Sequence, residues 1–166
     1  MMLYIVRHAE AKPAGPGVGD EVRRLTARGR ERTRDAAAGM VALGLKFDAI
    51  LTSPLPRAKE TAEIIAAAYP DGAQPQELSA LVGSVPPAQA LAALAPFGRN
   101  QSVLVVGHEP QLSGLVALLL TGTGDGLQVN FKKGACVALE LTRRFETGAA
   151  QLRWMLTQRH LRRLRK

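Results

Sequence analysis

The chain has 166 residues, the size of one domain and enough to bury about two thirds of the surface of its unfolded form. Its single cysteine, Cys136, excludes an internal disulfide framework, and a CxxC metal or redox site would need a second cysteine. The longest apolar run, Leu115 to Leu120, is far shorter than the ~20 residues that cross a bilayer, and the N-terminus lacks a basic segment followed by a long apolar core. We therefore expect a cytoplasmic protein with no membrane partner.

The formal net charge of +8 is concentrated at the C-terminal end. Residues 143–166 contain eight basic residues and one acid, Glu146, which leaves a net charge of +1 for the other 142 residues. We assign residues 158–166 to a basic C-terminal tail and residues 1–157 to the domain. Such a tail attracts acidic partners or RNA, but it has no aromatic side chain for base stacking, which argues against nucleic acid. A solvated or helical basic end is the simpler interpretation.

The first predicted strand ends in a polar cluster. Residues 3–6 form a short apolar run with Ile and Val, and Arg7, His8 and Glu10 follow it. In an open α/β sheet ligands bind beyond the carboxyl ends of the strands, so these side chains lie where an active site is expected. Residues 11–20 are rich in glycine and proline, including Pro16 and Gly17, and predict a flexible loop.

Two helices and a second strand follow. Thr26 can cap a helix that runs to about Leu43, and the arginines at positions 28, 30, 32 and 34 are assigned to its solvent-exposed face. Residues 47–52 predict a strand, and residues 58–69 predict a helix on which Thr61 is expected at the surface. Arg57 stands near the start of that helix, where a cation matches the macrodipole poorly. A bound anion such as phosphate would resolve that mismatch.

The second half of the chain repeats the strand and helix alternation. Residues 70–87 are expected to be irregular, and an alanine-rich helix starting at Pro86 or Pro87 extends through Leu94. Residues 102–106 are the clearest buried strand, and it ends at Gly107, His108, Glu109 and Pro110 before a helix over 111–120. Residues 135–141 and 152–156 predict a late hairpin added to the sheet. No composition break indicates a second domain.

Two predicted strands thus end in a histidine, His8 and His108, and a strand-turn-helix unit between them presents Arg57. Zinc binding would need carboxylates such as Glu10 or Glu109 to complete the ligand set. Two unrelated structural histidines would each be satisfied by hydrogen bonds. Phosphoryl transfer through histidine is the third hypothesis, and these residues alone leave all three open.

Three motifs in this order resemble the histidine phosphatase superfamily, which has the phosphoglycerate-mutase-like fold. They are residues 7–10 (Arg-His-Ala-Glu), residues 53–58 (Ser-Pro-Leu-Pro-Arg-Ala) with Thr61, and residues 107–110 (Gly-His-Glu-Pro). The resemblance covers about residues 2–157 and is closest to the SixA-type phosphohistidine phosphatases, although Ala9 replaces the commoner glycine of the first motif. It implies a single three-layer α/β/α domain with a mostly parallel central sheet and a late antiparallel edge.

The resemblance also implies roles for individual residues. His8 would attack phosphorus and carry the phosphoryl group as a covalent intermediate, which water hydrolyses. Arg7 and Arg57 would bind the phosphoryl oxygens and lower the pKa of His8, without metal or cofactor. Arg24 is the candidate for a third phosphate ligand, and His108 would donate a hydrogen bond to the phosphoryl group.

Esterases of this family supply a carboxylic acid from the middle of the chain, and Glu77 is the positional candidate here, although its surroundings do not reproduce their pattern. Imidazole leaves more easily than an alkoxide, so a phosphohistidine substrate depends less on such an acid. We therefore expect a metal-independent phosphatase acting on a phosphohistidine-bearing protein such as a phosphotransfer domain. A phosphomonoesterase for a small metabolite or sugar phosphate is the first alternative. A module that binds RNA or an acidic protein through the basic tail is the non-enzymatic one.

Overall fold

The structure is a computed structural model that describes residues 1–15 and 19–165. Pro16 and Gly17 of the loop predicted to be flexible, and Lys166 of the predicted basic tail, lie outside the described residues. Within the described part of the chain, none of the helices combines the length and hydropathy needed to cross a membrane.

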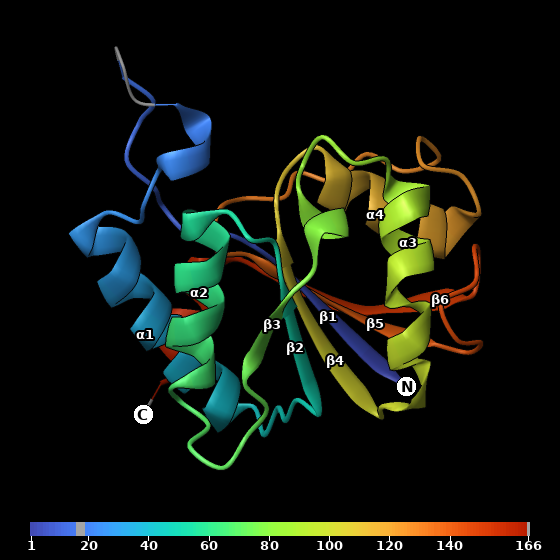
Figure 1. Ribbon diagram of the computed structural model, residues 1–166. Coiled ribbons are helices and arrows are strands. Elements are labelled where there is room, and N and C mark those ends of the chain that lie inside the picture. The colour runs from blue at the N-terminus through green and yellow to red at the C-terminus, as the bar shows by residue number, and fades with distance from the viewer. Residues whose placement is uncertain (16–18, 166) are drawn as a thin grey trace.

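Six strands form one sheet in the order β3-β2-β4-β1-β5-β6 (Figure 1). The strands are β1 (Met2–Arg7), β2 (Ala49–Thr52), β3 (Pro75–Glu77), β4 (Ser102–Gly107), β5 (Cys136–Leu141) and β6 (Ala150–Leu156). β3, β2, β4 and β1 pair in parallel, whereas β5 pairs antiparallel with both β1 and β6. The predicted α/β domain, with a mostly parallel sheet and a late antiparallel hairpin, is confirmed.

The third strand corrects the expectation of irregular structure over residues 70–87. Pro75–Glu77 is a three-residue edge strand paired with β2, and Gln76 and Glu77 are exposed. A strand this short, with no buried apolar residue, leaves no periodic pattern in the sequence. Its pairing therefore comes from the tertiary position of the segment beside β2.

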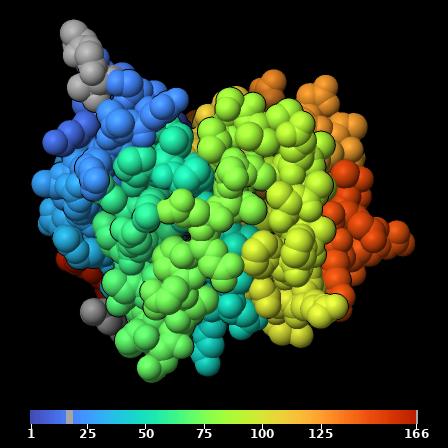
Figure 2. All heavy atoms as spheres, viewed as in Figure 1, coloured from blue at the N-terminus to red at the C-terminus, as the bar shows by residue number. Residues whose placement is uncertain are grey.

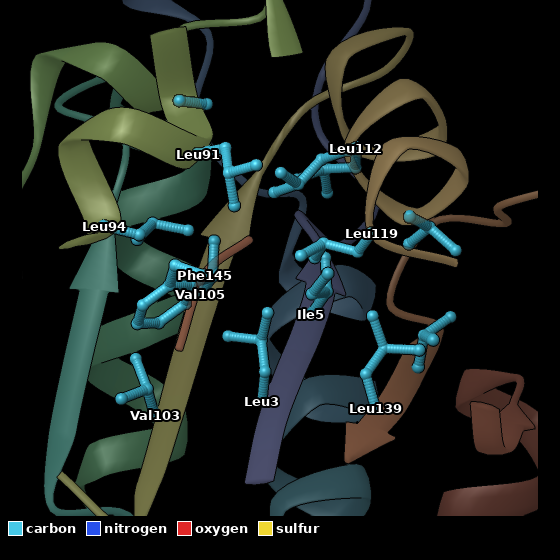
Figure 3. Close-up of a cluster of buried hydrophobic side chains, with 14 of the residues drawn as sticks. Leu3, Ile5, Leu91, Leu94, Val103, Val105, Leu112, Leu119, Leu139 and Phe145 are labelled. Atoms are coloured by element: carbon cyan, nitrogen blue, oxygen red, sulfur yellow. The ribbon is translucent and has the colours of Figure 1, made fainter. Parts of the chain in front are cut away.

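Helices cover both faces of the sheet (Figure 1). They are α1 (Ala27–Ala42), α2 (Pro56–Ala66), α3 (Pro87–Leu94), α4 (Gln111–Thr121) and α5 (Gln158–Leu164), with 3₁₀ turns at Asp20–Val22, Ser79–Leu81 and Ala95–Arg99. Side chains of α3 and α4 pack with Leu3, Ile5 and Val105 in one core cluster (Figure 3). Side chains of α1, α2 and α5 pack with Tyr4 and Val106 in the other. Alternate residues of each strand therefore face opposite helical layers, which gives the three-layer α/β/α arrangement.

Local capping sets the start of α1, as the sequence predicts. The side chain of Thr26 accepts a hydrogen bond from the backbone N–H of Gly29 at 2.8 Å. At the other end of the chain, residues 158–164 of the predicted tail form α5, which packs against α1. Leu161 is fully buried there, and the backbone of α5 lies so close to Gly39 that a Cβ on that glycine would clash with the Leu161 carbonyl oxygen.

Candidate active site

The sheet register brings the two predicted histidines together at the carboxyl ends of the parallel strands. Arg7 is paired with Gly107, so the next residue of each strand is a histidine, and the backbone N–H of His8 donates to the Gly107 carbonyl at 3.0 Å. The imidazole centroids of His8 and His108 are 5.1 Å apart. The two side chains therefore lie together at the carboxyl ends of neighbouring parallel strands, where ligands bind in open α/β sheets.

The His8 ring is buried, with 6% of the residue exposed, and its tautomer is defined by one contact. Nδ1 lies 2.8 Å from the carbonyl oxygen of Ala9. Because a carbonyl only accepts, Nδ1 carries the proton and Nε2 keeps its lone pair. Burial lowers the pKa of His8 to about 3, the bond to Ala9 opposes that shift, and His108, Arg57 and Arg7 add smaller lowering effects. The arginines, expected from the sequence to lower the pKa of His8, therefore contribute less than desolvation does.

His108 is oriented by a residue from the second strand-turn-helix unit. Its Nε2 lies 2.8 Å from Ser53 Oγ, and its buried Nδ1 has no hydrogen-bond partner in the described structure. Burial is also the main reason why the pKa of His108 is lowered to about 4, and the charge of Arg57 contributes. Both rings are therefore neutral at pH 7.

Two arginines accompany the histidines. Arg7 donates through Nη1 to the Phe131 carbonyl at 2.7 Å, and Arg57, at the start of α2, is 5% exposed. The Nε atoms of both side chains are buried without a partner in the described structure. Buried donors without acceptors are uncommon in folded proteins. Here two of them, Arg7 Nε and Arg57 Nε, belong to residues that the resemblance assigns to phosphate binding, and His108 Nδ1 is a third when Ser53 donates its hydroxyl proton to Nε2.

An internal carboxylate occupies the outer side of Arg57. Its Nη2 donates to Asp20 Oδ2 at 2.7 Å and its Nη1 donates to the Asp20 backbone carbonyl at 2.6 Å. Arg23 also donates to the Asp20 carboxylate, and this hydrogen bond is the main reason why the pKa of Asp20 is lowered. The sequence predicts an anion at Arg57, and the structure places a carboxylate there.

Arg24, the candidate third phosphate ligand, is not brought to this cluster. Its side chain is 67% exposed and pairs with Glu60 on α2 at 3.2 Å. The adjacent Arg23 is the one that reaches the site, since it shares Asp20 with Arg57 and its charge contributes to the lowered pKa of His108. The sequence shows two consecutive arginines, and only the backbone path decides which of them faces inward.

The candidate general acid, Glu77, also lies away from the histidines. In the sheet register it is level with Thr52, Val106 and Val6, three strands from β1 and so about 14 Å away laterally. Its carboxylate accepts a hydrogen bond from the exposed Lys59 at 2.7 Å.

The carboxylates that follow the two histidines in sequence are also engaged by other groups. Glu10 pairs with Arg32 and Thr26. Glu109 accepts hydrogen bonds from the backbone and side chain of Ser113.

Thr61 is buried, contrary to the expectation from the sequence. Instead of lying on the surface of α2, it is 1% exposed. Its Oγ1 accepts a hydrogen bond from the backbone N–H of Ala9 at 3.1 Å and donates to the Arg57 carbonyl at 2.7 Å. It therefore links the loop that holds His8 to the turn of helix that holds Arg57. Its place four residues after Arg57, on the same helical face, was the available signal.

Comparisons with known proteins agree with this geometry. The family model described as the histidine phosphatase superfamily, branch 1, matches residues 3–82. An uncharacterized protein of Picosynechococcus sp. is 35% identical over 154 residues, which cover 92% of this chain and 88% of that protein. The chain belongs to the histidine phosphatase superfamily, and it is accordingly a phosphatase of the hydrolase class.

Solved structures that resemble this chain over nearly its whole length identify its fold. The structure of the protein histidine phosphatase SixA with tungstate has a TM-score of 0.85 and 24% identity, and covers 97% of this chain and 99% of that chain. The α-ribazole phosphatase of Shigella flexneri has a TM-score of 0.74 and 19% identity, and covers 95% of this chain and 97% of that chain. These likenesses establish the fold, which both a protein phosphatase and a small-molecule phosphatase share.

Proposed function

We propose that this protein hydrolyses phosphohistidine on a protein partner, through a covalent phosphoryl intermediate on His8. The observation that carries the proposal is the convergence of a neutral imidazole, whose Nε2 lone pair is free, with buried donors that lack acceptors. A phosphoryl group supplies the acceptor oxygens that these donors need.

Both the tautomer and the charge state of His8 favour its role as nucleophile. The bond from Nδ1 to Ala9 presents Nε2 to phosphorus, and burial keeps the ring neutral at physiological pH. Attack forms the Nε2–P bond while the bond from phosphorus to the substrate imidazole breaks. Water then attacks the phosphoryl group on His8 and releases inorganic phosphate.

Positive charge around the phosphoryl oxygens provides the stabilisation. Arg7 and Arg57 are both next to His8 and hold donors available to equatorial oxygens, while His108 offers Nδ1 when Ser53 donates its hydroxyl proton to Nε2. Arg23 joins them once the phosphoryl group displaces the Asp20 carboxylate from its two arginines.

The preference for phosphohistidine is supported by the position of the carboxylates. Glu77, Glu10 and Glu109 each form contacts outside the histidine cluster. Asp20, the carboxylate at Arg57, is a poor proton donor because the hydrogen bond from Arg23 lowers its pKa. An alkoxide leaving group needs a proton from a strong general acid. The imidazole of phosphohistidine leaves as a neutral ring when its other nitrogen already carries a proton, and because the conjugate acid of imidazole has a pKa of about 6.5, such a ring is a much weaker base than an alkoxide. The likeness to the α-ribazole phosphatase fold supports the second candidate, hydrolysis of a small phosphate ester.

Phosphate release in the presence of EDTA from three substrates tests the proposal. They are a phosphohistidine peptide, an aryl phosphate, whose leaving group needs little protonation, and an alkyl phosphate, which needs a strong acid. We expect the first two to be hydrolysed and the alkyl phosphate to be turned over at least about 10²-fold more slowly, the usual contribution of a general acid.

His8→Asn should lower turnover by at least about 10³-fold, and His160→Gln is the matched control because it removes an exposed imidazole. Equal turnover of the alkyl phosphate would favour the small-ester alternative. Turnover that survives His8→Asn would refute the assigned chemistry.

A further inference from the structure

A cavity of about 640 Å³ lies beside His108, outside the phosphate-binding cluster. It is open to solvent and is lined by the segment before α3, the start of α4 and the loop after α4. Gly83 and Glu109 both line it, and a Cβ on Gly83 would lie 2.9 Å from the Cβ of His108. The cavity wall is thus in contact with the backbone that carries His108. In Figure 2 the yellow-green surface near residue 85 adjoins the orange surface near residue 125 at the upper right.

Gln111, which lines this cavity, has a side-chain acceptor without a partner. The residue is 1% exposed, and its Nε2 donates to the carbonyls of Ala80 at 2.7 Å and Val85 at 2.8 Å. Both amide protons are therefore used, and the amide orientation is fixed because carbonyl groups cannot donate. Oε1 is buried and has no partner in the described structure. Most buried carbonyl oxygens accept a hydrogen bond, so a donor is expected to bind here.

The charge lining the cavity is negative in a chain whose net charge is +8. Glu109 and Asp125 are lining residues, and among the described residues that line the cavity none is basic. The Glu109 carboxylate is held in place by Ser113 and retains lone pairs for further donors. The acceptors at this site thus suit a group rich in N–H donors and carrying positive charge.

The lining also includes apolar side chains, beside the polar Ser84, Ser113 and Gln128. Val85, Pro87, Pro110 and Leu127 line the same cavity. Lysine and arginine carry a polar head on an aliphatic stem, and the stem is stabilised by apolar contacts while the head meets acceptors. The cavity therefore offers both kinds of surface that one long basic side chain requires.

We propose that this cavity is a specificity subsite, which binds a lysine or arginine side chain next to the phosphohistidine in the substrate protein. The inference rests on the proposed function, because it assigns the residue that accompanies phosphohistidine in the same active site. Gln111, Glu109 and Asp125 are the specificity-determining residues. The basic residue binds in this cavity while the phosphoryl group is held by His8, Arg7 and Arg57.

Matched phosphohistidine peptides that carry lysine, glutamine or glutamate beside the phosphohistidine test the subsite. For the wild type we expect kcat/KM to be about tenfold higher for the lysine peptide than for the glutamine peptide, the value of one charge-assisted hydrogen bond, and lowest for the glutamate peptide. The double variant Glu109→Gln, Asp125→Asn should bring the lysine and glutamine peptides to equal kcat/KM. Glu146→Gln is the control, because Glu146 is an exposed acid on the loop between β5 and β6, outside the cavity.

The outcomes separate this inference from the proposed function. Turnover of all three peptides with equal kcat/KM would refute the subsite and leave the phosphohistidine phosphatase standing. The Glu109→Gln, Asp125→Asn variant could instead lower kcat/KM by the same factor for the lysine and glutamine peptides, so that the preference for lysine is retained. That result would place a carboxylate in the chemistry and would also refute the subsite. Failure of the wild type to hydrolyse any phosphohistidine peptide would refute both proposals.

Discussion

The two buried histidines make stability depend on pH in a way that can be calculated from their pKa values. Burial lowers the pKa of His8 to about 3 and that of His108 to about 4, from an ordinary value of 6.5. Between pH 6.5 and these folded-state values the unfolded chain binds protons that the folded chain does not. The free energy of unfolding must therefore fall as the pH falls through this window, and the stabilisation is fully present only above pH 6.5.

The size of the effect follows from the width of the window. Each pH unit is worth about 1.4 kcal/mol per proton, so acidification from pH 6.5 to pH 5 costs about 2 kcal/mol for each ring and about 4 kcal/mol for both. That is a large share of the roughly 5 to 15 kcal/mol that stabilises a domain. Urea unfolding at pH 7 and pH 5, followed by the fluorescence of Trp154, the single tryptophan, measures it.

Other groups also titrate in this range, so the test is the difference between variants. His8→Asn and His108→Asn should each reduce the loss of stability between pH 7 and pH 5 by about 2 kcal/mol. His160→Gln, which removes an exposed imidazole and keeps a helix-capping side chain, should leave the loss as in the wild type. An identical pH dependence in the wild type and in the double His8→Asn, His108→Asn variant would refute the assignment of neutral, buried rings.

Four further predictions follow from single contacts. Thr61→Val leaves a buried N–H without an acceptor and should cost about 1 to 3 kcal/mol in urea unfolding together with much of the turnover, and Thr61→Ser should restore both. Asp20→Asn removes the carboxylate that competes for Arg57 and should tighten inhibition by inorganic phosphate severalfold; weaker inhibition would show that Asp20 instead orients the arginine. Gly39→Ala should lower the melting temperature, because the added methyl group would clash with the backbone of α5. Helix propensity alone would stabilise α1 by about 1 kcal/mol, so a raised melting temperature would contradict this packing. Glu77→Gln should keep kcat on a phosphohistidine peptide within about twofold, whereas a loss near 10²-fold would make Glu77 the general acid.

Elements with a strong local signal could be predicted from the sequence. Residues 102–106 are an uninterrupted apolar run and form most of β4, and Thr26 caps α1 as its side chain requires. The strand Pro75–Glu77 could not be predicted, because its pairing with β2 is the only feature that makes it a strand. Local patterns thus identify the elements that carry the core, and edge pairing depends on the assembled sheet.

The part of the site that lies directly at the strand ends could be predicted from the sequence. His8 and His108 each follow a buried strand, and neighbouring parallel strands place their ends side by side, so the pair could be inferred. The choice between Arg23 and Arg24 depends on which side of an irregular backbone segment faces the cluster, and no periodicity describes such a segment. Thr61 was misplaced for a related reason, since a threonine on a polar helix looks exposed until its partners are known.

The low pKa of His8 also explains how one pocket can hold a phosphoryl dianion and a neutral nucleophile. A bound dianion raises the pKa of a nearby imidazole, and protonation would remove the lone pair that attacks phosphorus. In the free protein that pKa is about 3, so it can rise by about three units before half of the rings are protonated near pH 6. Arg7 and Arg57 oppose the rise, because they neutralise the same dianion. Burial therefore sets the pKa of His8 low enough, and the arginines limit its rise when the dianion binds. The site can in this way bind an anion tightly while His8 stays unprotonated.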